Sequence, residues 1–275
     1  MDPLTIITFC GGAYLLNKLF GDDTTEEKPP QKEHPYKENN KLPSTDKKSE
    51  TKEKNTKDIL LLTKSAKNGG LCVAGIDIQN KQWIRLVSSD TKSDGALSKQ
   101  FMQKDRNGYP IFFSQTIAGY RISFPKVVRV WLRQACPNSV QKENFLIDET
   151  EKFYFLRKTA LDEIQKYTDN DQFIYGSTSS FVEEHELSFN GASLKMFCVK
   201  NLQIYRITDV AGKHHSRASF CYNNLKYLDI RVTDGDFFEI ENATFSKALI
   251  VVSLPHETFK GKYYKFIAKI FPLSE

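Results

Sequence analysis

The 275-residue sequence has few cysteines, and their spacing is irregular. It has no Cys-x-x-Cys pair, so a zinc site would have to gather its ligands from distant parts of the chain. We therefore expect free thiols in a reducing compartment, with no metal and no cofactor. The five cysteines are Cys10, Cys72, Cys136, Cys198 and Cys221.

The common motifs of catalysis are also missing. The sequence contains no P-loop, no Gly-x-Ser-x-Gly and no His-Glu-x-x-His, and no nuclease-like set of spaced acids with a lysine. Asp234, with His214 and His215 upstream, has the residue types for acid–base chemistry. However, Asp234-Gly235-Asp236 is also typical of a turn in which a carboxylate accepts backbone N–H groups. We predict the turn, no catalytic residues, and a protein that is not an enzyme.

Residues 22–57 lack isoleucine, valine and phenylalanine, and contain one leucine and one tyrosine. Such a segment cannot bury enough apolar surface to offset the entropy lost on ordering, so we predict a disordered linker. Its nine acids and nine lysines cancel, which favours a spacer over charge-driven binding. The net charge of +5 therefore lies in residues 58–275, where it favours an anionic partner without requiring one.

The first 21 residues, MDPLTIITFCGGAYLLNKLFG, are mostly apolar. Asp2 is the only charge before the apolar run, whereas a secretory signal needs positive charge there. Counted over residues 3–20, with Lys18 extended toward the headgroups, the run reaches the ~17 residues of a short membrane span. We predict a hydrophobic helix that anchors the chain to the inner membrane, spanning or interfacial, with the rest of the chain in the cytoplasm. A helix that docks on a partner is the alternative.

From Asp58 onward the pattern is that of strands. ILLLT is a short apolar run of buried-strand length, and LCVAGIDI is joined to QWIRLVS by a short polar turn, as in a hairpin. Similar runs follow, up to YYKFIAKIF near the C-terminus, and only RKTALDEIQKYT has a helical pattern. We predict a mainly β fold with two tandem small barrels, SH3-like or OB-like, joined by one or two connecting helices.

Three blocks of the sequence resemble a known family, and this resemblance favours OB-like over SH3-like barrels. They are LTKSAKNGGLCVAGIDIQNKQWIRLVS, LQIYRITDVAGKHHSRASFCYNNLKYLDIRVTDGDFF and ALIVVSLPHETFKGKYYKFIAKIF. In this order and spacing the blocks resemble the dual-OB-containing domain family of bacterial proteins, over residues 58–275. The chain departs from that family's pattern after the central helix, where DNDQFIYGSTSSFVEEHELS has neither the tryptophan segment nor the Asp-Arg pair.

The resemblance implies two OB folds in tandem. We expect a first barrel at residues 58–150, a helical connector at 151–190 and a second barrel at 191–275. It also implies nucleic-acid binding in bacterial defence or conflict systems.

Trp83 and Arg85 are the first candidate contacts. Residues i and i+2 share one face of a strand, so a ring for stacking lies beside a cation for phosphate. The alternative is that Trp83 closes the end of the barrel while Arg85 pairs with an acid.

Two further groups extend the candidate surface. Arg129, Trp131 and Arg133 alternate with apolar residues that would fill a barrel, so they should point outward. Lys213, His214, His215 and Arg217 form a basic loop between strands, where OB folds place the edge of their binding groove. A solvated hairpin tip is the alternative for this loop.

Together these features predict a membrane-tethered module that binds or senses nucleic acid, single-stranded rather than duplex. Any effector activity would come from a partner protein. The alternative function is a protein-interaction adaptor built on the same barrels.

Overall fold

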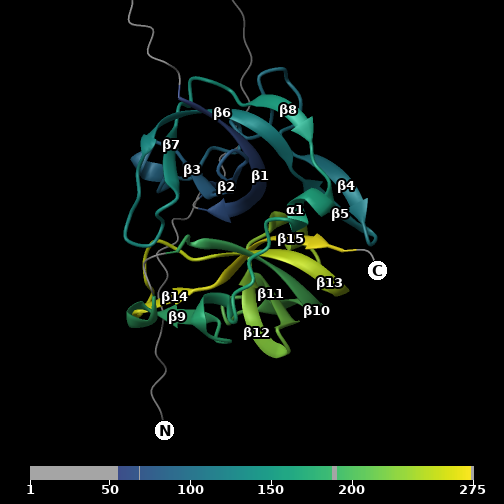
Figure 1. Cartoon of the computed structure of the whole chain (residues 1–275). Coiled ribbons are helices and arrows are strands. Elements are labelled where there is room, and N and C mark those ends of the chain that lie inside the picture. The colour runs from purple at the N-terminus through teal and green to yellow at the C-terminus, as the bar shows by residue number, and fades with distance from the viewer. Residues whose placement is uncertain (1–54, 68, 188–190, 274–275) are drawn as a thin grey trace, which may run out of the picture. The chain divides into compact units, whose positions relative to one another are not determined.

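The computed structural model describes residues 55–67, 69–187 and 191–273, which consist mainly of strands and loops (Figure 1). The predicted anchor at residues 1–21 and nearly all of the predicted linker lie outside these residues. Within the described part of the chain, no helix is long and apolar enough to cross a membrane.

The first half of the described chain forms a sheet that closes on itself. The strand order is β1-β2-β3-β7-β6-β8, and an additional pairing of β1 with β6 joins five of these strands into a ring. β3 and β7 are parallel, whereas the other neighbours are antiparallel. The strands are β1 (Thr56–Lys67), β2 (Gly70–Asp77), β3 (Trp83–Val87), β6 (Lys126–Ala135), β7 (Asn144–Ile147) and β8 (Tyr154–Lys158); β4 (Phe113–Ile117) and β5 (Tyr120–Phe124) form a separate hairpin.

The second half forms a closed barrel with the strand order β10-β11-β12-β15-β13. In chain order this is first, second, third, fifth and fourth, with a parallel pair between the third and fifth strands. The first ring has the same order and the same parallel pair, and this five-stranded arrangement is that of an OB fold. The predicted pair of OB-like barrels is therefore confirmed. The strands are β10 (Leu194–Thr208), β11 (His214–Tyr222), β12 (Leu225–Val232), β13 (Asn242–Ser253) and β15 (Phe266–Pro272).

The connecting segment contains the predicted helix, in a shorter form. The sequence predicts a helix across RKTALDEIQKYT, whereas α1 spans only Leu161–Gln165. Arg157 and Lys158 belong to β8 and pair with β6, so the helix cannot include them and begins only after them. The other short elements are the 3-10 turns Thr91–Ser93, Ile174–Gly176, Glu184–Glu186 and Gly235–Phe237, and a two-stranded ribbon of β9 (Phe181–Glu183) with β14 (Lys262–Tyr264).

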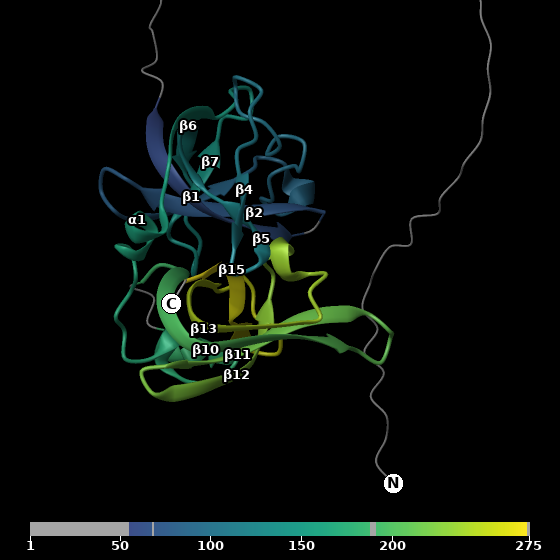
Figure 2. The same cartoon turned by 90° about the vertical axis from the view of Figure 1, so that its right-hand side faces the viewer.

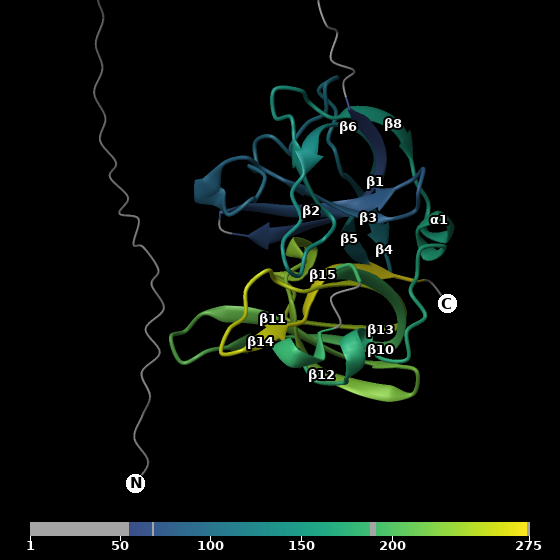
Figure 3. The same ribbon diagram turned by 60° about the vertical axis from the view of Figure 1, so that its left-hand side comes forward.

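The two barrels share a buried core. Ile59 and Leu61 of β1 pack inside the first barrel with Val128 of β6. Leu60 and Leu62 point to the other side, where they belong to the core that also fills the second barrel. Both faces of β1 are therefore buried, which explains its uninterrupted apolar run. Figures 1 and 3 show the first barrel, in blue and teal, stacked on the second, in green and yellow.

Gly75 of β2 is required by the close approach of β1. A Cβ at this position would lie 2.1 Å from the carbonyl oxygen of Leu60 and 2.9 Å from a methyl carbon of Ile59. The register of β1 on β2 shifts near this point, between Leu61 and Thr63. The glycine thus lets the two backbones come together at an irregular position of the sheet.

We predict that Gly75→Ala destabilises the protein by about 1–3 kcal/mol, since the backbone of β1 has to move to admit the methyl group. Urea denaturation measures the change. Gly235→Ala is the matched control, because a Cβ there meets nothing within 4 Å. Equal stability of the two variants would contradict the prediction.

Candidate nucleic-acid interface

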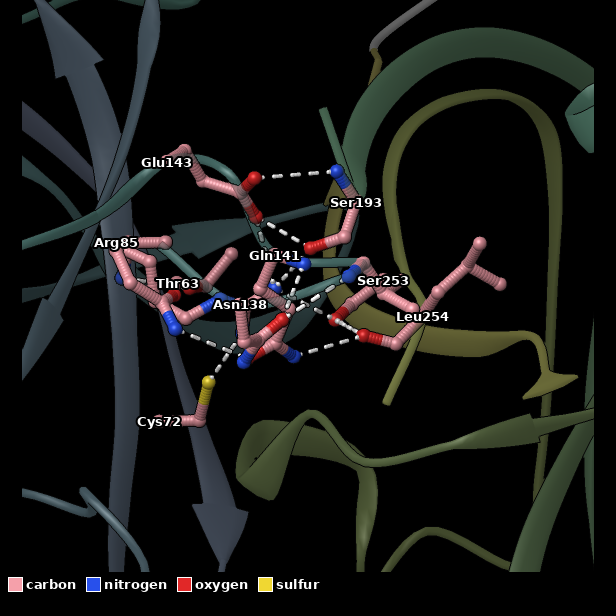
Figure 4. A network of polar contacts seen from close by, with 12 residues as sticks. Thr63, Cys72, Arg85, Asn138, Gln141, Glu143, Ser193, Ser253 and Leu254 are labelled. Atoms are coloured by element: carbon pink, nitrogen blue, oxygen red, sulfur yellow. Dashed lines mark hydrogen bonds and ion pairs between the residues drawn. The ribbon is translucent and has the colours of Figure 1, made fainter. Parts of the chain in front are cut away.

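Arg85 lies in the interior, and the expectation that it faces a ligand is wrong. Its side chain is 4% exposed and forms an ion pair with Glu143 at 3.3 Å. It also donates to Ser193 Oγ at 2.8 Å and contacts Cys72 Sγ at 2.8 Å (Figure 4). Ser193 directly precedes β10. Arg85 does point out of its own barrel, but the second barrel covers that face.

Trp83 shares this covered face. It is half-buried and packs against the core that the barrels have in common. The ring therefore contributes to the contact between barrels, and the expected pairing of an exposed tryptophan with an exposed arginine is not present.

Arg129 and Arg133 point outward on β6 as predicted, while Val128, Val130 and Leu132 fill the first barrel. Trp131 between the two arginines is half-buried. Each arginine has an acidic partner. Arg129 makes two hydrogen bonds with Asp58, at 2.7 and 2.9 Å, and Arg133 lies 3.4 Å from Asp148. Much of the positive charge of this face is therefore neutralised, and its role as a nucleic-acid contact stays a prediction.

Lys213, His214 and His215 of the β10–β11 hairpin line a cavity of about 360 Å³ together with residues from other strands. We call this cavity the basic cleft. Figure 2 shows the hairpin, in green, extending beyond the second barrel. The described residues that line the basic cleft are Ala66, Arg206, Lys213, His214, His215, Ser216, Arg231, Val232, Thr233, Phe238 and Glu239.

Strand register explains why cations gather beside the basic cleft. Arg217 of β11 pairs directly with Arg231 of β12, so the two guanidinium groups lie on the same outer face of the barrel. His215 is two residues from Arg217 and shares that face. Like charges placed directly opposite each other are destabilising, and a bound anion would relieve this repulsion.

Arg231 has no carboxylate partner among the described residues. Its Nη2 lies 3.4 Å from Nδ1 of His215, whose Nε2 is 2.8 Å from Asp209 Oδ2. Since a guanidinium can only donate, His215 Nδ1 is the acceptor in the contact with Arg231. Burial, with a further contribution from Arg217, lowers the pKa of Arg231 from its ordinary value. The half-buried cation is thus held in place without being neutralised.

Arg206 and Phe238 form another wall of the basic cleft. Arg206 donates to the carbonyl oxygen of Phe238 at 3.1 Å and lies 3.6 Å from Glu239, whose side chain is 96% exposed. The Phe238 ring is itself exposed. An exposed ring beside cations can stack on a base while the cations contact phosphate.

The sequence predicted a basic loop of Lys213, His214, His215 and Arg217, but β11 begins at His214 and pairs with β10 from that residue on, so only Lys213 lies in the turn. The prediction omitted Arg206, Arg231 and Phe238. Arg231 is in the strand YLDIRV, where it follows the buried Ile230 and precedes the buried Val232. Alternation alone would have placed Arg231 outward, but only the register places it opposite Arg217. The turn predicted at Asp234 is confirmed, since its carboxylate accepts from the backbone N–H of Asp236 at 3.1 Å. In the described ranges, no three His, Cys, Asp or Glu side chains are grouped as a metal site needs.

Two OB barrels with a basic cleft at the face of the second and third strands define a binding module, because OB folds use this face and the adjoining loops to hold ligands. A family model described as the dual OB-containing domain matches residues 57–270, and the chain belongs to this family. Members of the OB class are typically binding modules, so the assignment indicates a role in binding nucleic acid or protein. Searches among curated proteins and among solved structures found no match.

We predict that Arg85→Met destabilises the protein by about 3–5 kcal/mol, because it leaves Glu143 buried without its counter-charge. Adding Glu143→Gln to the Arg85→Met variant should restore part of the lost free energy of unfolding. Urea denaturation of the single and double variants gives both values. As a control, Arg129→Met removes an exposed ion pair and should leave the denaturation midpoint almost unchanged. A midpoint for Arg85→Met equal to that of the unmodified protein would contradict the structural role.

Proposed function

We propose that the chain binds single-stranded nucleic acid in the basic cleft of the second barrel. The observation that carries the proposal is Arg231, a half-buried cation that lacks an acidic partner among the described residues and lies beside Arg217. Phe238 supplies an exposed ring in the same cleft. Cations that face a cleft without compensation favour an anionic ligand, and the planar guanidinium of arginine is suited to bidentate hydrogen bonds with phosphate.

The contrast with the other predicted contacts supports this location. Arg85 is paired with Glu143, Arg129 with Asp58 and Arg133 with Asp148. Binding at those positions requires breaking an existing ion pair, whereas Arg231 offers its charge without that cost.

A single strand fits better than a duplex because its bases are free to stack on Phe238, whereas the bases of a duplex are stacked on each other. Sequence-specific readout is not part of the proposal. Stacking on a ring and contacts to phosphate accept any base.

Fluorescence anisotropy with short single-stranded DNA and RNA tests the proposal. We expect binding that weakens steeply between 50 and 200 mM salt, as phosphate contacts require. Arg231→Gln should weaken binding by about tenfold or more, because a hydrogen bond from a charged group contributes roughly 1.5–3 kcal/mol, and should reduce the salt slope by about 1.

Lys226→Gln is the matched control. Lys226 is an exposed cation on the same strand as Arg231, but it does not line the basic cleft. Absence of binding to any strand at 50 mM salt would overturn the proposal. A protein partner captured in a pull-down that nuclease treatment does not affect would then favour the adaptor function.

We also propose that residues 3–20 attach the module to the inner membrane, with the barrels in the cytoplasm and an effector supplied by another protein. The apolar character of MDPLTIITFCGGAYLLNKLFG supports the attachment, and the family resemblance supports a setting in bacterial defence. We expect the full chain in the membrane fraction and a chain that begins at Thr51 in the soluble fraction. Recovery of both in the soluble fraction would contradict the attachment.

A further inference from the structure

We infer that the basic cleft holds the phosphomonoester at one end of a single-stranded nucleic acid, and not an internal stretch of the strand. This inference rests on the proposed function and specifies the part of the ligand that enters the cleft. Three features of the second barrel and its contact with the first carry it.

The first feature is that a wall from the first barrel limits the cleft. The backbone N–H of Ala66, in β1, donates to the carbonyl oxygen of Thr233, just after β12, at 3.4 Å, and both residues line the cleft. A nucleic acid that ran along the outer face of β12 toward Thr233 would therefore meet β1. A site of about 360 Å³ with such a wall is in the size range of pockets for small ligands, roughly 300–1,000 Å³. It suits a terminal group better than a strand that passes through.

The second feature is the amount of positive charge around the cleft. Arg231, Arg206 and Lys213 line it, and Arg217 lies next to Arg231 on the same face. An internal phosphodiester carries a single negative charge, whereas a phosphomonoester carries about −1.5 to −2 at pH 7. The terminal group therefore compensates the repulsion between Arg217 and Arg231 more completely.

The acids near the cleft leave most of this charge available. Asp209 is engaged with His215, and Glu239 is almost fully exposed beside Arg206. Asp229 is 3.9 Å from Arg217, which is a weak pairing for two groups that solvent reaches.

The third feature is the fixed position of Arg231. One of its terminal nitrogens donates to His215, which Asp209 holds from the other side. A guanidinium has five N–H donors, and a phosphate with three terminal oxygens can accept from two of them at once. Phe238 then lies in the same cleft for the base or sugar of the terminal nucleotide. This ring favours a nucleotide over a phosphorylated peptide as the source of the phosphate.

The test compares four versions of one oligonucleotide that carries an internal fluorophore. They have a 5′-phosphate, a 3′-phosphate, hydroxyl groups at both ends, or a circular form without ends. Anisotropy with the full chain should show one phosphorylated version binding at least tenfold more tightly than the hydroxyl version. The circular strand should bind no better than the hydroxyl version.

Arg231→Gln should remove this preference for the phosphorylated end, and Lys213→Gln, a change of an exposed loop residue, should reduce it. Lys226→Gln should leave it intact. Circular dichroism checks that each variant is folded. If Arg231→Gln does not fold, the loss of the preference in Lys213→Gln tests the inference instead.

The outcomes separate the inference from the proposed function. Equal binding of all four versions overturns the inference and leaves nucleic-acid binding in place. No binding of any version overturns both. Tighter binding of a phosphoserine peptide than of the phosphorylated oligonucleotide also overturns the inference, because the ligand would then be a modified protein.

Discussion

Glu143 and Ser193 hold the guanidinium of Arg85 where the two barrels meet, in a position that is 4% exposed. The charge of a buried arginine needs partners, and Nη2 of Arg85 finds them in Glu143 and Ser193 while its Nε has none. This contact therefore requires the second barrel to lie where Ser193 reaches the first. The contact of Arg85 acts as a polar clamp between the barrels, and in a second such clamp the charged side chain comes from the second barrel. Asp236 of the second barrel accepts from the backbone N–H and the hydroxyl of Ser123, at 2.6 and 2.7 Å. The buried Lys269 contacts the same carboxylate.

The orientation that these contacts impose also shapes the basic cleft. It brings the end of β1 to Thr233, so a residue of the first barrel forms part of the wall of the basic cleft. The shared apolar core, to which β1 contributes Leu60 and Leu62, supplies much of the stability, while the polar clamps restrict how the barrels can pack. Both OB folds therefore contribute residues to the basic cleft.

Local patterns in the sequence predicted much of the fold. Alternation in VVRVWLRQ placed Val128 and Val130 inside and Arg129 outside, and the run ILLLT indicated a buried strand. The three blocks identified the family, and the family model agrees over residues 57–270. The central helix was predicted too long, because strand pairing of Arg157 and Lys158 outweighs their helical propensity.

The candidate site was predicted less completely. A strand pattern tells which side chains leave the barrel, but not what then covers them. Arg85 and Arg129 both point out of the first barrel, yet one is enclosed by the second barrel and the other is paired with Asp58. Arg231 was omitted because nothing local to YLDIRV distinguishes it from a solvated arginine.

What the sequence by itself determined is the part that depends on neighbouring residues, namely the strands, the turn at Asp234 and the resemblance to the family. The predicted basic loop is different, because His214 to Arg217 belong to β11 and only Lys213 lies in the turn. Period-two alternation and turn chemistry act over a few residues, so they can be read directly. Tertiary structure alone decided which cations remain unpaired. That outcome depends on the register between β11 and β12, which places Arg217 opposite Arg231, and on the packing of one barrel against the other, which encloses Arg85. Both arise from contacts between residues far apart in the chain, and no local pattern records them.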